Sequence, residues 1–329
     1  MKFRLLGKTG LKCSIIGFGC WGLGGVAYGP TNEKISMNAV EKAFDLGINF
    51  FDTSDLYGKD YDGKSEIILG KTLKNKRDKV LIATKFGLLP HKGWHMPENY
   101  SLNYLASALD NSLKRLRTDY IDLIQLHSPS LDTLKNKTKM FNVCNFLIKK
   151  KKEGKIRSFG ISVRSPNDGL YVVKNFKKFQ TIQANFNIID QRSLENGLLY
   201  YCKKNNVGFI ARTPLVYGYL TGRLTDETKL KKNDHRKKWS KKQLKIWSTA
   251  PSFFYQLKNK KQSMAQFCLN FCNSYAEVST TIPGMLNAKQ VIENCNSTEY
   301  HSLNKNIKNK IFEIYKSNEW TNLLNKKNV

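Results

Sequence analysis

The fold of this 329-residue chain is decided by the stretch SIIGFGCWGLGGVAYGP, residues 14–30. Gly17, Gly19 and Gly22 have the G-x-G-x-x-G spacing of a dinucleotide-binding turn, and a short apolar run precedes them. In a Rossmann fold the third glycine opens a helix. Here LGGVAYGP follows Gly22, and its glycines and proline cannot open a helix. The stretch therefore indicates the end of a buried strand, followed by a loop.

Eight short apolar runs, of which this strand is the first, alternate with amphipathic stretches. Each run is nearly uninterrupted in apolar character, as a parallel strand buried on both faces requires. We predict strands at Ile15–Gly19, Asn49–Thr53, Val80–Lys85, Ile121–His127, Ile156–Ser162, Thr181–Asn185, Gly208–Thr213 and Glu277–Ile282. We predict helices at Glu33–Leu46, Ser65–Leu73, Ser101–Leu116, Met140–Glu153, Asn167–Asn175, Ser193–Asn205, Ser263–Cys272 and Asn287–Asn294. Eight such units are typical of the (β/α)8 TIM barrel, so the predicted fold class is α/β.

Three segments lie outside this repeat. The first, FRLLGKTGLKCSII, predicts an N-terminal hairpin with its turn at Gly7–Gly10, placed to close the bottom of the barrel. The second is a long basic insertion from about Gly218 to Gln262, a length typical of functional covers or of disordered loops. The third, Ile307–Leu324, predicts an extra C-terminal helix. Because no linker divides the chain, we expect residues 1–329 to form a single domain.

The charge of the chain is strongly positive. It carries 55 Lys and Arg against 26 Asp and Glu, a net charge of +29. A basic surface attracts phosphates, so a nucleic-acid partner is one interpretation. Lysine far outnumbers arginine, however, whereas proteins that read bases rely on the bidentate contacts of arginine. We therefore interpret the charge as a bias of composition and expect no nucleic-acid partner.

Cysteine usage and the N-terminus indicate a cytoplasmic protein. The seven cysteines form no C-x-x-C pair, which predicts reduced thiols. Cys268 and Cys272 have a spacing compatible with metal ligation, but no His or second Cys pair stands near them in the sequence, so we expect no metal site. The first residues, MKFRLLGKTGLK, lack the apolar segment of a signal peptide. Glycines and Pro30 interrupt the uncharged stretch from Cys13 to Thr31, so we expect no membrane span.

Four chemically active side chains follow consecutive predicted strands. Asp52 ends the second strand, Tyr57 lies in the loop after it, Lys85 ends the third strand, and His127 ends the fourth. The carboxyl ends of the strands form the mouth of a TIM barrel, where active sites lie. We therefore expect these four side chains to meet there.

Together these four groups suit the reduction of a carbonyl. An ion pair between Asp52 and Lys85 would place a positive charge beside Tyr57. That charge would lower the pKa of the phenol and make Tyr57 a usable general acid. A hydrogen bond from His127 would polarise the carbonyl oxygen, and its protonation would accompany hydride delivery to the carbon.

The chain resembles the aldo-keto reductase superfamily along nearly its whole length. The matching stretches are GFGCWGLGG, NFFDTSDLYG, SEIILGKTL, LIATKFG, LDNSLKRLRTDYIDLIQLH, KIRSFGISV, QANFNIID, TPLVYGYLTGRL and IPGMLNAKQVIEN. By the family pattern, the catalytic tetrad falls on Asp52, Tyr57, Lys85 and His127. The resemblance also implies that an extended nicotinamide cofactor lies across the barrel mouth without a Rossmann domain.

The resemblance assigns cofactor contacts to positions along the chain. Ser162 and Gln183 match the residues that hydrogen-bond the carboxamide, and Thr213–Arg223 resembles the loop that wraps the pyrophosphate. The stretch IPGM and the start of the helix after it resemble the adenosine phosphate site, where a helix N-terminus suits an anion. The implied cofactor contacts are Trp21, Asp52, Ser162, Gln183, Arg212, Pro214, Leu215, Gly218, Leu220, Arg223, Gly284, Gln290, Glu293 and Asn294.

Three departures from the family pattern concern this cofactor. Val163 replaces a common Asn, and Arg212 replaces the aromatic residue that stacks on the nicotinamide. A guanidinium stacks on rings but is repelled by the cationic, oxidised nicotinamide. Many relatives hold the 2′-phosphate of NADPH with a basic residue near Gly284–Leu286, and this chain has none there. Because Lys289 and the insertion at His235–Lys238 supply charge instead, we favour NADPH and leave NADH open.

The aromatic residues Trp21, Tyr28, Phe86 and Trp94 lie where they would line an apolar pocket for a small carbonyl compound. A second interpretation within the family is a nucleotide-sensing regulator resembling potassium-channel β subunits. A Rossmann dehydrogenase is disfavoured because no helix opens after Gly22.

Overall fold

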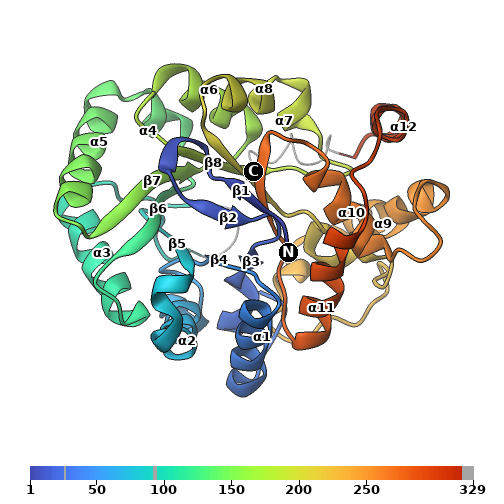
Figure 1. Ribbon diagram of the computed structural model, residues 1–329, viewed down its shortest axis with the longest axis horizontal. Helices are drawn as coiled ribbons and strands as arrows, with labels where there is room; N and C mark the ends of the chain where they lie inside the picture. Colours follow the sequence, from blue (N-terminus) through green and yellow to red (C-terminus); the bar gives the residue numbers. More distant parts are fainter. Residues whose placement is uncertain (26, 92–94, 321–329) are drawn as a thin grey trace.

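Eight parallel strands form the centre of the protein (Figure 1). The computed structural model describes residues 1–25, 27–91 and 95–320. In that part of the chain the sheet contains β3 (Phe18–Gly19), β4 (Phe50–Asp52), β5 (Leu81–Phe86), β6 (Ile121–His127), β7 (Ile156–Ser162), β8 (Thr181–Asn185), β9 (Gly208–Arg212) and β10 (Val278–Ile282). The Gly17 N–H donates to the Thr281 carbonyl at 2.8 Å, and the Gly19 N–H donates to the Pro283 carbonyl at 2.9 Å. These bonds join the first strand to the last and confirm the predicted barrel.

Helices surround the barrel in the predicted order (Figure 1). They are α1 (Glu33–Asp45), α2 (Lys64–Thr72), α3 (Leu102–Leu116), α5 (Lys137–Lys152), α6 (Pro166–Asn175), α8 (Leu198–Lys204), α10 (Met264–Asn273) and α11 (Ala288–Asn296). Local capping sets their starts. The Asn32 side chain accepts from the Ile35 N–H and so caps the start of α1. In the described residues between Gly22 and Asn32 no α-helix begins; the glycine motif ends in the 3-10 helix η2 (Cys20–Gly24) instead of the predicted loop. Ser263 and Gln266 form a capping box at the start of α10.

Some boundaries differ from the sequence prediction. The helix expected at 193–205 is divided into α7 (Arg192–Glu195) and α8, because Gly197 between them has a left-handed φ of 80°. A short helix, α4 (Leu131–Lys135), precedes α5. The extra C-terminal helix is α12 (Lys305–Lys316), which begins before the predicted start and ends earlier than predicted; residues 321–324 of the prediction lie outside the described residues.

The N-terminal hairpin closes the bottom of the barrel, as predicted. Its strands are β1 (Phe3–Leu5) and β2 (Lys12–Ser14), joined through the 3-10 helix η1 (Gly7–Thr9). Leu6 and Cys13 are fully buried in one cluster with Phe50 and Leu81, the first residues of β4 and β5. A Cβ on Gly7 would lie 2.2 Å from the backbone nitrogen of Gly208, so the hairpin meets the barrel at van der Waals distance only because this residue is glycine.

The basic insertion is folded and packs on the barrel. It contains most of η5 (Val216–Thr221), and η6 (His235–Lys238), α9 (Lys241–Thr249) and η7 (Ala250–Leu257). Trp247 and Phe254 are buried in the main hydrophobic core. An isolated antiparallel bridge joins Asp234 to Tyr28, so the insertion reaches the loop after β3. Of the two possibilities for this long segment, the structure therefore shows an ordered cover.

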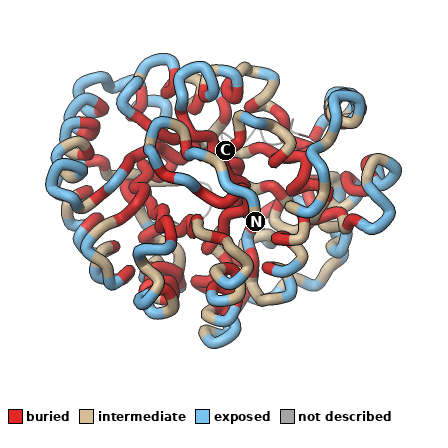
Figure 2. The backbone as a smooth tube through the Cα atoms, in the orientation of Figure 1, coloured by how far each residue is buried: buried red, intermediate tan, exposed pale blue. Residues whose placement is uncertain are grey.

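Burial follows the barrel architecture. The strands are buried, and exposed residues lie mainly on the outer faces of the helices and in the loops (Figure 2). No helix in the described part of the chain is long and apolar enough to cross a membrane. The other short 3-10 helices are η2 (Cys20–Gly24), η3 (Lys59–Tyr61), η4 (Lys74–Lys79) and η8 (Ser297–Glu299).

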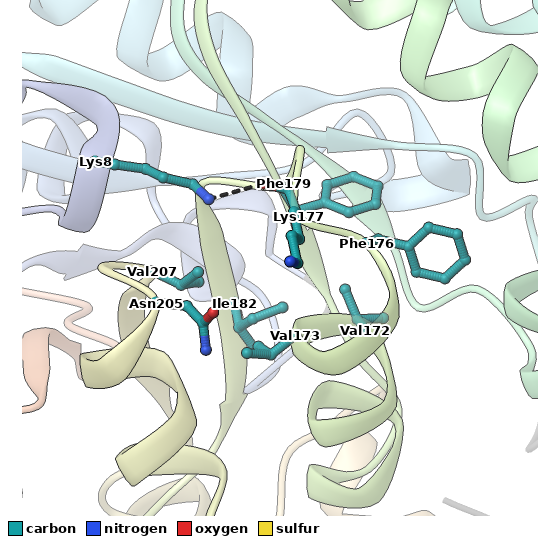
Figure 3. A pocket seen from close by; sticks show the side chains of 9 residues that line it. All are labelled: Lys8, Val172, Val173, Phe176, Lys177, Phe179, Ile182, Asn205 and Val207. Carbon is teal, nitrogen blue, oxygen red and sulfur yellow. Dashed lines mark hydrogen bonds between the residues drawn. The ribbon is translucent and has the colours of Figure 1, made fainter.

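A small pocket lies at the hairpin end of the barrel (Figure 3). Lys8 of η1 reaches over it and donates from Nζ to the Lys177 carbonyl at 2.7 Å. Phe179 and Val207 line it just before β8 and β9 begin. This pocket is therefore at the amino ends of the strands, opposite the mouth at which active sites of this fold lie.

Candidate active site

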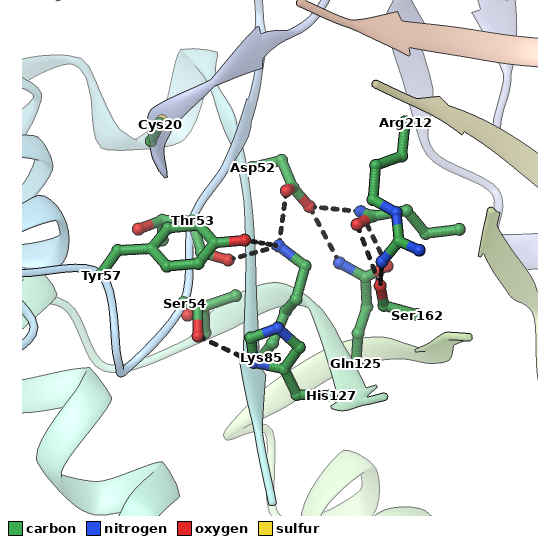
Figure 4. Close-up of polar contacts among 12 residues, drawn as sticks. Cys20, Asp52, Thr53, Ser54, Tyr57, Lys85, Gln125, His127, Ser162 and Arg212 are labelled. Carbon is green, nitrogen blue, oxygen red and sulfur yellow. Dashed lines mark hydrogen bonds and ion pairs between the residues drawn. The ribbon is translucent and has the colours of Figure 1, made fainter. Parts of the chain in front are cut away.

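The four side chains predicted from the sequence meet at the mouth of the barrel (Figure 4). Asp52 is the last residue of β4, Lys85 lies one residue before the end of β5, and His127 ends β6. The Lys85 Nζ lies 2.5 Å from the Asp52 Oδ1 and donates to the Thr53 carbonyl at 2.8 Å. It also lies 3.3 Å from the Tyr57 Oη. One ammonium thus connects the carboxylate to the phenol.

The second carboxylate oxygen of Asp52 accepts two amide hydrogen bonds. The Gln125 Nε2 donates to it at 3.0 Å, and the Gln183 Nε2 donates at 2.7 Å. Gln125 was not among the sequence-predicted residues. A signal was present, because Gln125 precedes His127 by two residues on a strand and therefore faces the same side. The two amides hold Asp52 in place independently of Lys85.

Burial sets the charges of the Lys85–Tyr57 pair. Burial lowers the pKa of Lys85, but the combined effect of Asp52 and Tyr57 raises it by more. The net shift of the pKa is upward, so the ammonium stays charged. Burial raises the pKa of Tyr57, and Lys85 only partly offsets that increase. The expectation that Lys85 brings the Tyr57 pKa below its ordinary value is therefore wrong for this structure. Tyr57 is a protonated phenol at neutral pH, as a proton donor must be.

His127 is neutral. Its imidazole is buried, and burial, followed by the positive charges of Lys85 and Arg212, holds its pKa well below the ordinary value. Its ring lies perpendicular to that of Tyr57, with the ring centroids 6.1 Å apart. The Nδ1 atom lies 3.1 Å from the Ser54 Oγ, and the second ring nitrogen lies on the side of Lys85 and Tyr57 (Figure 4). A neutral imidazole carries one N–H, so its tautomer decides whether it can donate to a ligand.

Arg212 joins the residues expected at the nicotinamide into one network. At the end of β9, it donates to the Ser162 Oγ at 3.1 Å, to the Val163 carbonyl at 2.9 Å and to the Asn185 Oδ1 at 3.0 Å. The Ser162 Oγ donates in turn to the Gln183 Oε1 at 3.1 Å. The guanidinium is thus held in place by three acceptors. Burial lowers its pKa, but arginine in proteins does not lose its proton, so the guanidinium is charged.

The loop after β9 has unusual backbone geometry. Thr213, Val216 and Tyr217 have φ values of 58°, 44° and 56°, and Gly218 follows at 96°. Left-handed conformations cost non-glycine residues of order 1 kcal/mol or more and cluster at ligand sites. Backbone N–H groups in such turns converge on anions. This segment includes Pro214 and Leu215, and Leu220 is buried in the core, so a ligand would meet the loop mainly through its backbone.

The residues expected at the adenosine end lie on α11 and around it. The Asn287 side chain caps this helix, and Gln290 accepts from the Leu286 N–H at 2.8 Å. Arg223 and Glu293 form a bidentate ion pair, with N–O distances of 2.9 and 2.6 Å. Asn294 is buried, and Gly284 is exposed on the strand-end loop. The sequence did not indicate that Arg223 and Glu293 bind each other.

Four aromatic rings cover the mouth. The Trp21 ring centroid lies 6.2 Å from that of Tyr57, 5.9 Å from Tyr28 and 4.4 Å from His235. Tyr217 lies 4.7 Å from His235. The His235 Nδ1 contacts the Ala27 carbonyl, which only accepts, so this nitrogen carries the ring proton. The buried Nε2 atom is then an acceptor without a hydrogen-bond partner among the described residues. His235 was singled out in the sequence only for its charge.

The remaining predicted contacts lie elsewhere. Phe86 is fully buried in the main hydrophobic core, and its role as a substrate contact stays a prediction. Trp94 lies outside the described residues. A small cleft lies beside the mouth, between the loops after β8 and β9 and the insertion, and Asn185, Tyr217 and Trp247 line it. Among residues 1–25, 27–91 and 95–320, no group of three or more His, Cys, Asp or Glu side chains could hold a metal ion.

Comparison with known proteins decides the family. The model of the "Aldo/keto reductase family" matches residues 15–316, nearly the whole chain. The chain belongs to the aldo-keto reductase family. It is therefore an oxidoreductase of a family that acts on small carbonyl compounds with a nicotinamide cofactor, NADH or NADPH.

Relatives extend over most of this aldo-keto reductase. The "Aldo-keto reductase YhdN" of Bacillus subtilis is 34% identical over 76% of this chain and 74% of its own length. The "L-galactose dehydrogenase" of Arabidopsis thaliana is 32% identical over 92% of this chain and 90% of its own length. Among solved structures, the holo form of aldo-keto reductase AKR11C1 from Bacillus halodurans superposes with a TM-score of 0.77 at 28% identity, covering 95% of this chain and 96% of that one.

Proposed function

We propose that this protein is an NADPH-dependent reductase that converts an aldehyde or ketone into an alcohol. The observation that carries the proposal is the contact of one buried ammonium, Lys85, with both the Asp52 carboxylate and the Tyr57 hydroxyl beside His127. Family membership supplies the reaction class, and this geometry supplies the proton. Residues 1–329 act in this proposal as a single cytoplasmic domain without a nucleic-acid partner.

Each of the four residues has a distinct role in the proposal. Tyr57 donates its proton to the carbonyl oxygen of the substrate as that oxygen becomes negative. Lys85 stabilises the tyrosinate left behind, because its charge lies 3.3 Å from the phenol oxygen. Asp52 keeps Lys85 charged and in place. His127 orients the carbonyl by a hydrogen bond from its ring. When bound, the reduced nicotinamide supplies the hydride that reaches the carbonyl carbon.

The residues of the mouth suit a dinucleotide. Ser162 and Gln183 offer a hydroxyl and an amide where the carboxamide would lie. The left-handed turns at Val216–Gly218 would present backbone to the pyrophosphate. Lys289 lies in the first turn of α11 and would supply positive charge to a 2′-phosphate. This last point favours NADPH, and kcat/KM measured with both cofactors tests it.

The decisive experiment is cofactor oxidation across a panel of aldehydes, ketones and sugars, with Tyr57→Phe as the matched variant. The substitution removes only the phenol oxygen, so folding and cofactor binding are expected to persist. General acids contribute roughly 10²–10⁴-fold to rate, and we expect kcat to fall by that factor. Turnover that survives in Tyr57→Phe, or no turnover with any carbonyl, would contradict the proposal. Retained cofactor binding without turnover would favour the nucleotide-sensing regulator.

A further inference from the structure

A hydrogen-bonded chain leads from His127 to a buried carboxyl that the proposed mechanism does not use. The Ser54 Oγ lies 3.1 Å from the His127 Nδ1 and 3.0 Å from the Asp55 Oδ1 (Figure 4 shows the first of these contacts). Ser54 is fully buried, and Asp55 is 7% exposed. The Leu56 N–H also donates to the Ser54 Oγ, at 3.3 Å. A single hydroxyl thus lies between the imidazole and the carboxyl.

We propose that Asp55 is a positioning residue, which sets through Ser54 the ring nitrogen of His127 that carries the proton. A hydroxyl has one proton to donate. An ionised Asp55 can only accept hydrogen bonds, so the Ser54 hydroxyl donates its hydrogen bond to Asp55. The Ser54 oxygen then accepts from Nδ1–H, and the second nitrogen, Nε2, has a lone pair. The ring cannot then donate to a carbonyl from Nε2.

Protonation of Asp55 reverses the direction of each hydrogen bond between Asp55, Ser54 and His127. The neutral carboxyl donates to the Ser54 oxygen, the Ser54 hydroxyl donates to Nδ1, and the ring proton stands on Nε2. The change takes up one proton from solvent, and no other atom is exchanged. Nε2 is the nitrogen on the side of Tyr57 and Lys85, so this form can donate to a substrate carbonyl.

The surroundings of Asp55 favour proton uptake. Glu66 of α2 is the neighbouring carboxylate, and Arg115 of α3 is the neighbouring cation. Arg115 is paired with Glu66 at 2.7 Å, and Lys85 of β5 is paired with Asp52. Among the described residues, the buried phenol of Tyr100 and the half-buried phenol of Tyr104 also interact with Asp55.

These surroundings place the titration near neutrality. Burial and then Glu66 raise the pKa of Asp55 to about 7, against the smaller effects of Ser54 and Arg115. The carboxyl therefore changes its charge within the pH range of an ordinary assay. His127 itself stays neutral throughout that range.

The test measures the tautomer directly, by ¹⁵N NMR of the histidine-labelled protein without ligand. The His127 signals are assigned by comparison with a His127→Gln sample. We expect the wild-type ring to pass from Nε2–H at pH 6 to Nδ1–H at pH 8.5. In Asp55→Asn the side-chain amide donates to Ser54 permanently, so Nε2–H should persist at every pH. In Ser54→Ala the residue at position 55 is still Asp, but the His127 tautomer should no longer follow the titration of Asp55.

Kinetics supply the second readout, and this one rests on the proposed function. The wild-type kcat/KM for carbonyl reduction should fall about tenfold from pH 6 to 8.5, the equivalent of one lost hydrogen bond of about 1.4 kcal/mol. The kcat/KM of Asp55→Asn should vary by less than about twofold over the same pH range. A merely structural role of Asp55 would not produce this difference between the two pH profiles.

A wild-type tautomer that is constant from pH 6 to 8.5, or an Asp55→Asn tautomer that still titrates, would overturn the inference. If the tautomer follows the expected pattern and no carbonyl is reduced, the proposed function fails while the positioning role stands.

Discussion

The buried Asp52–Lys85 pair makes a quantitative prediction. The Lys85 side chain is 0% exposed and that of Asp52 is 4% exposed, so neither charge is solvated by bulk water if its partner is removed. Removing one member of a buried pair typically costs 3–5 kcal/mol, because the other charge is left unpaired. In Lys85→Met, Asp52 keeps the amides of Gln125 and Gln183. We therefore expect the lower end, a loss of about 3 kcal/mol in unfolding free energy.

The variant of Asp52 and the double variant complete a double-mutant cycle. In Asp52→Asn, Lys85 keeps the Thr53 carbonyl at 2.8 Å, and we expect a similar loss of about 3 kcal/mol. The double variant has no unpaired buried charge, so its loss should be no more than about 3 kcal/mol, well below the sum of about 6. The coupling energy is then at least about 3 kcal/mol, far above that of independent sites.

The assay is urea unfolding at pH 7 of the wild type and the three variants, together with reductase activity. The exposed pair Lys203–Glu277, with an N–O distance of 3.4 Å, provides the matched control. Lys203→Met should cost less than about 1 kcal/mol, because water solvates the remaining carboxylate. Losses at Asp52 and Lys85 that add to within about 0.5 kcal/mol would refute the reasoning. We expect all three active-site variants to lose reductase activity.

Three further predictions concern the cofactor, the tyrosine loop and pH. Because Arg212 is held beside the expected nicotinamide, the oxidised cofactor should bind at least about fivefold more weakly than the reduced one, and Arg212→Tyr should narrow that ratio; equal dissociation constants in a fluorescence titration would contradict this. A Cβ at Gly24 would lie 2.7 Å from the Tyr57 carbonyl and 2.8 Å from the Gly58 Cα, so Gly24→Ala should displace the tyrosine and lower kcat by about 10–100-fold, whereas an unchanged kcat would show that the loop adapts. The pKa of Asp55 is raised from an ordinary 3.8 to about 7, so its contribution to stability is lost as pH rises through that window. The unfolding free energy of Asp55→Asn, measured by urea unfolding, should therefore rise by roughly 3–4 kcal/mol relative to that of the wild type between pH 4 and 8. A difference between the two proteins that is the same at every pH would refute this prediction.

The sequence alone determined the barrel and the convergence of its active residues. Eight buried runs alternating with helices leave one reasonable architecture, and parallel strands bring their carboxyl ends to one edge. Asp52, Lys85 and His127 could therefore be placed together without coordinates. The hairpin was also predictable, because its glycines and alternating apolar residues are local signals.

Only the tertiary structure decided how these groups behave. The charge state of Tyr57 depends on burial, which outweighs the nearby ammonium, and no spacing in the sequence reports burial. The same holds for the amides on Asp52, the acceptors around Arg212 and the contact of His235 with Ala27, which join residues far apart in the chain. The sequence contained Ser54 and Asp55 beside each other, but only the fold places His127 against that hydroxyl. Hydrogen bonds and pKa values depend on distances of a few ångströms between separate strands, and these are set by packing rather than by local pattern.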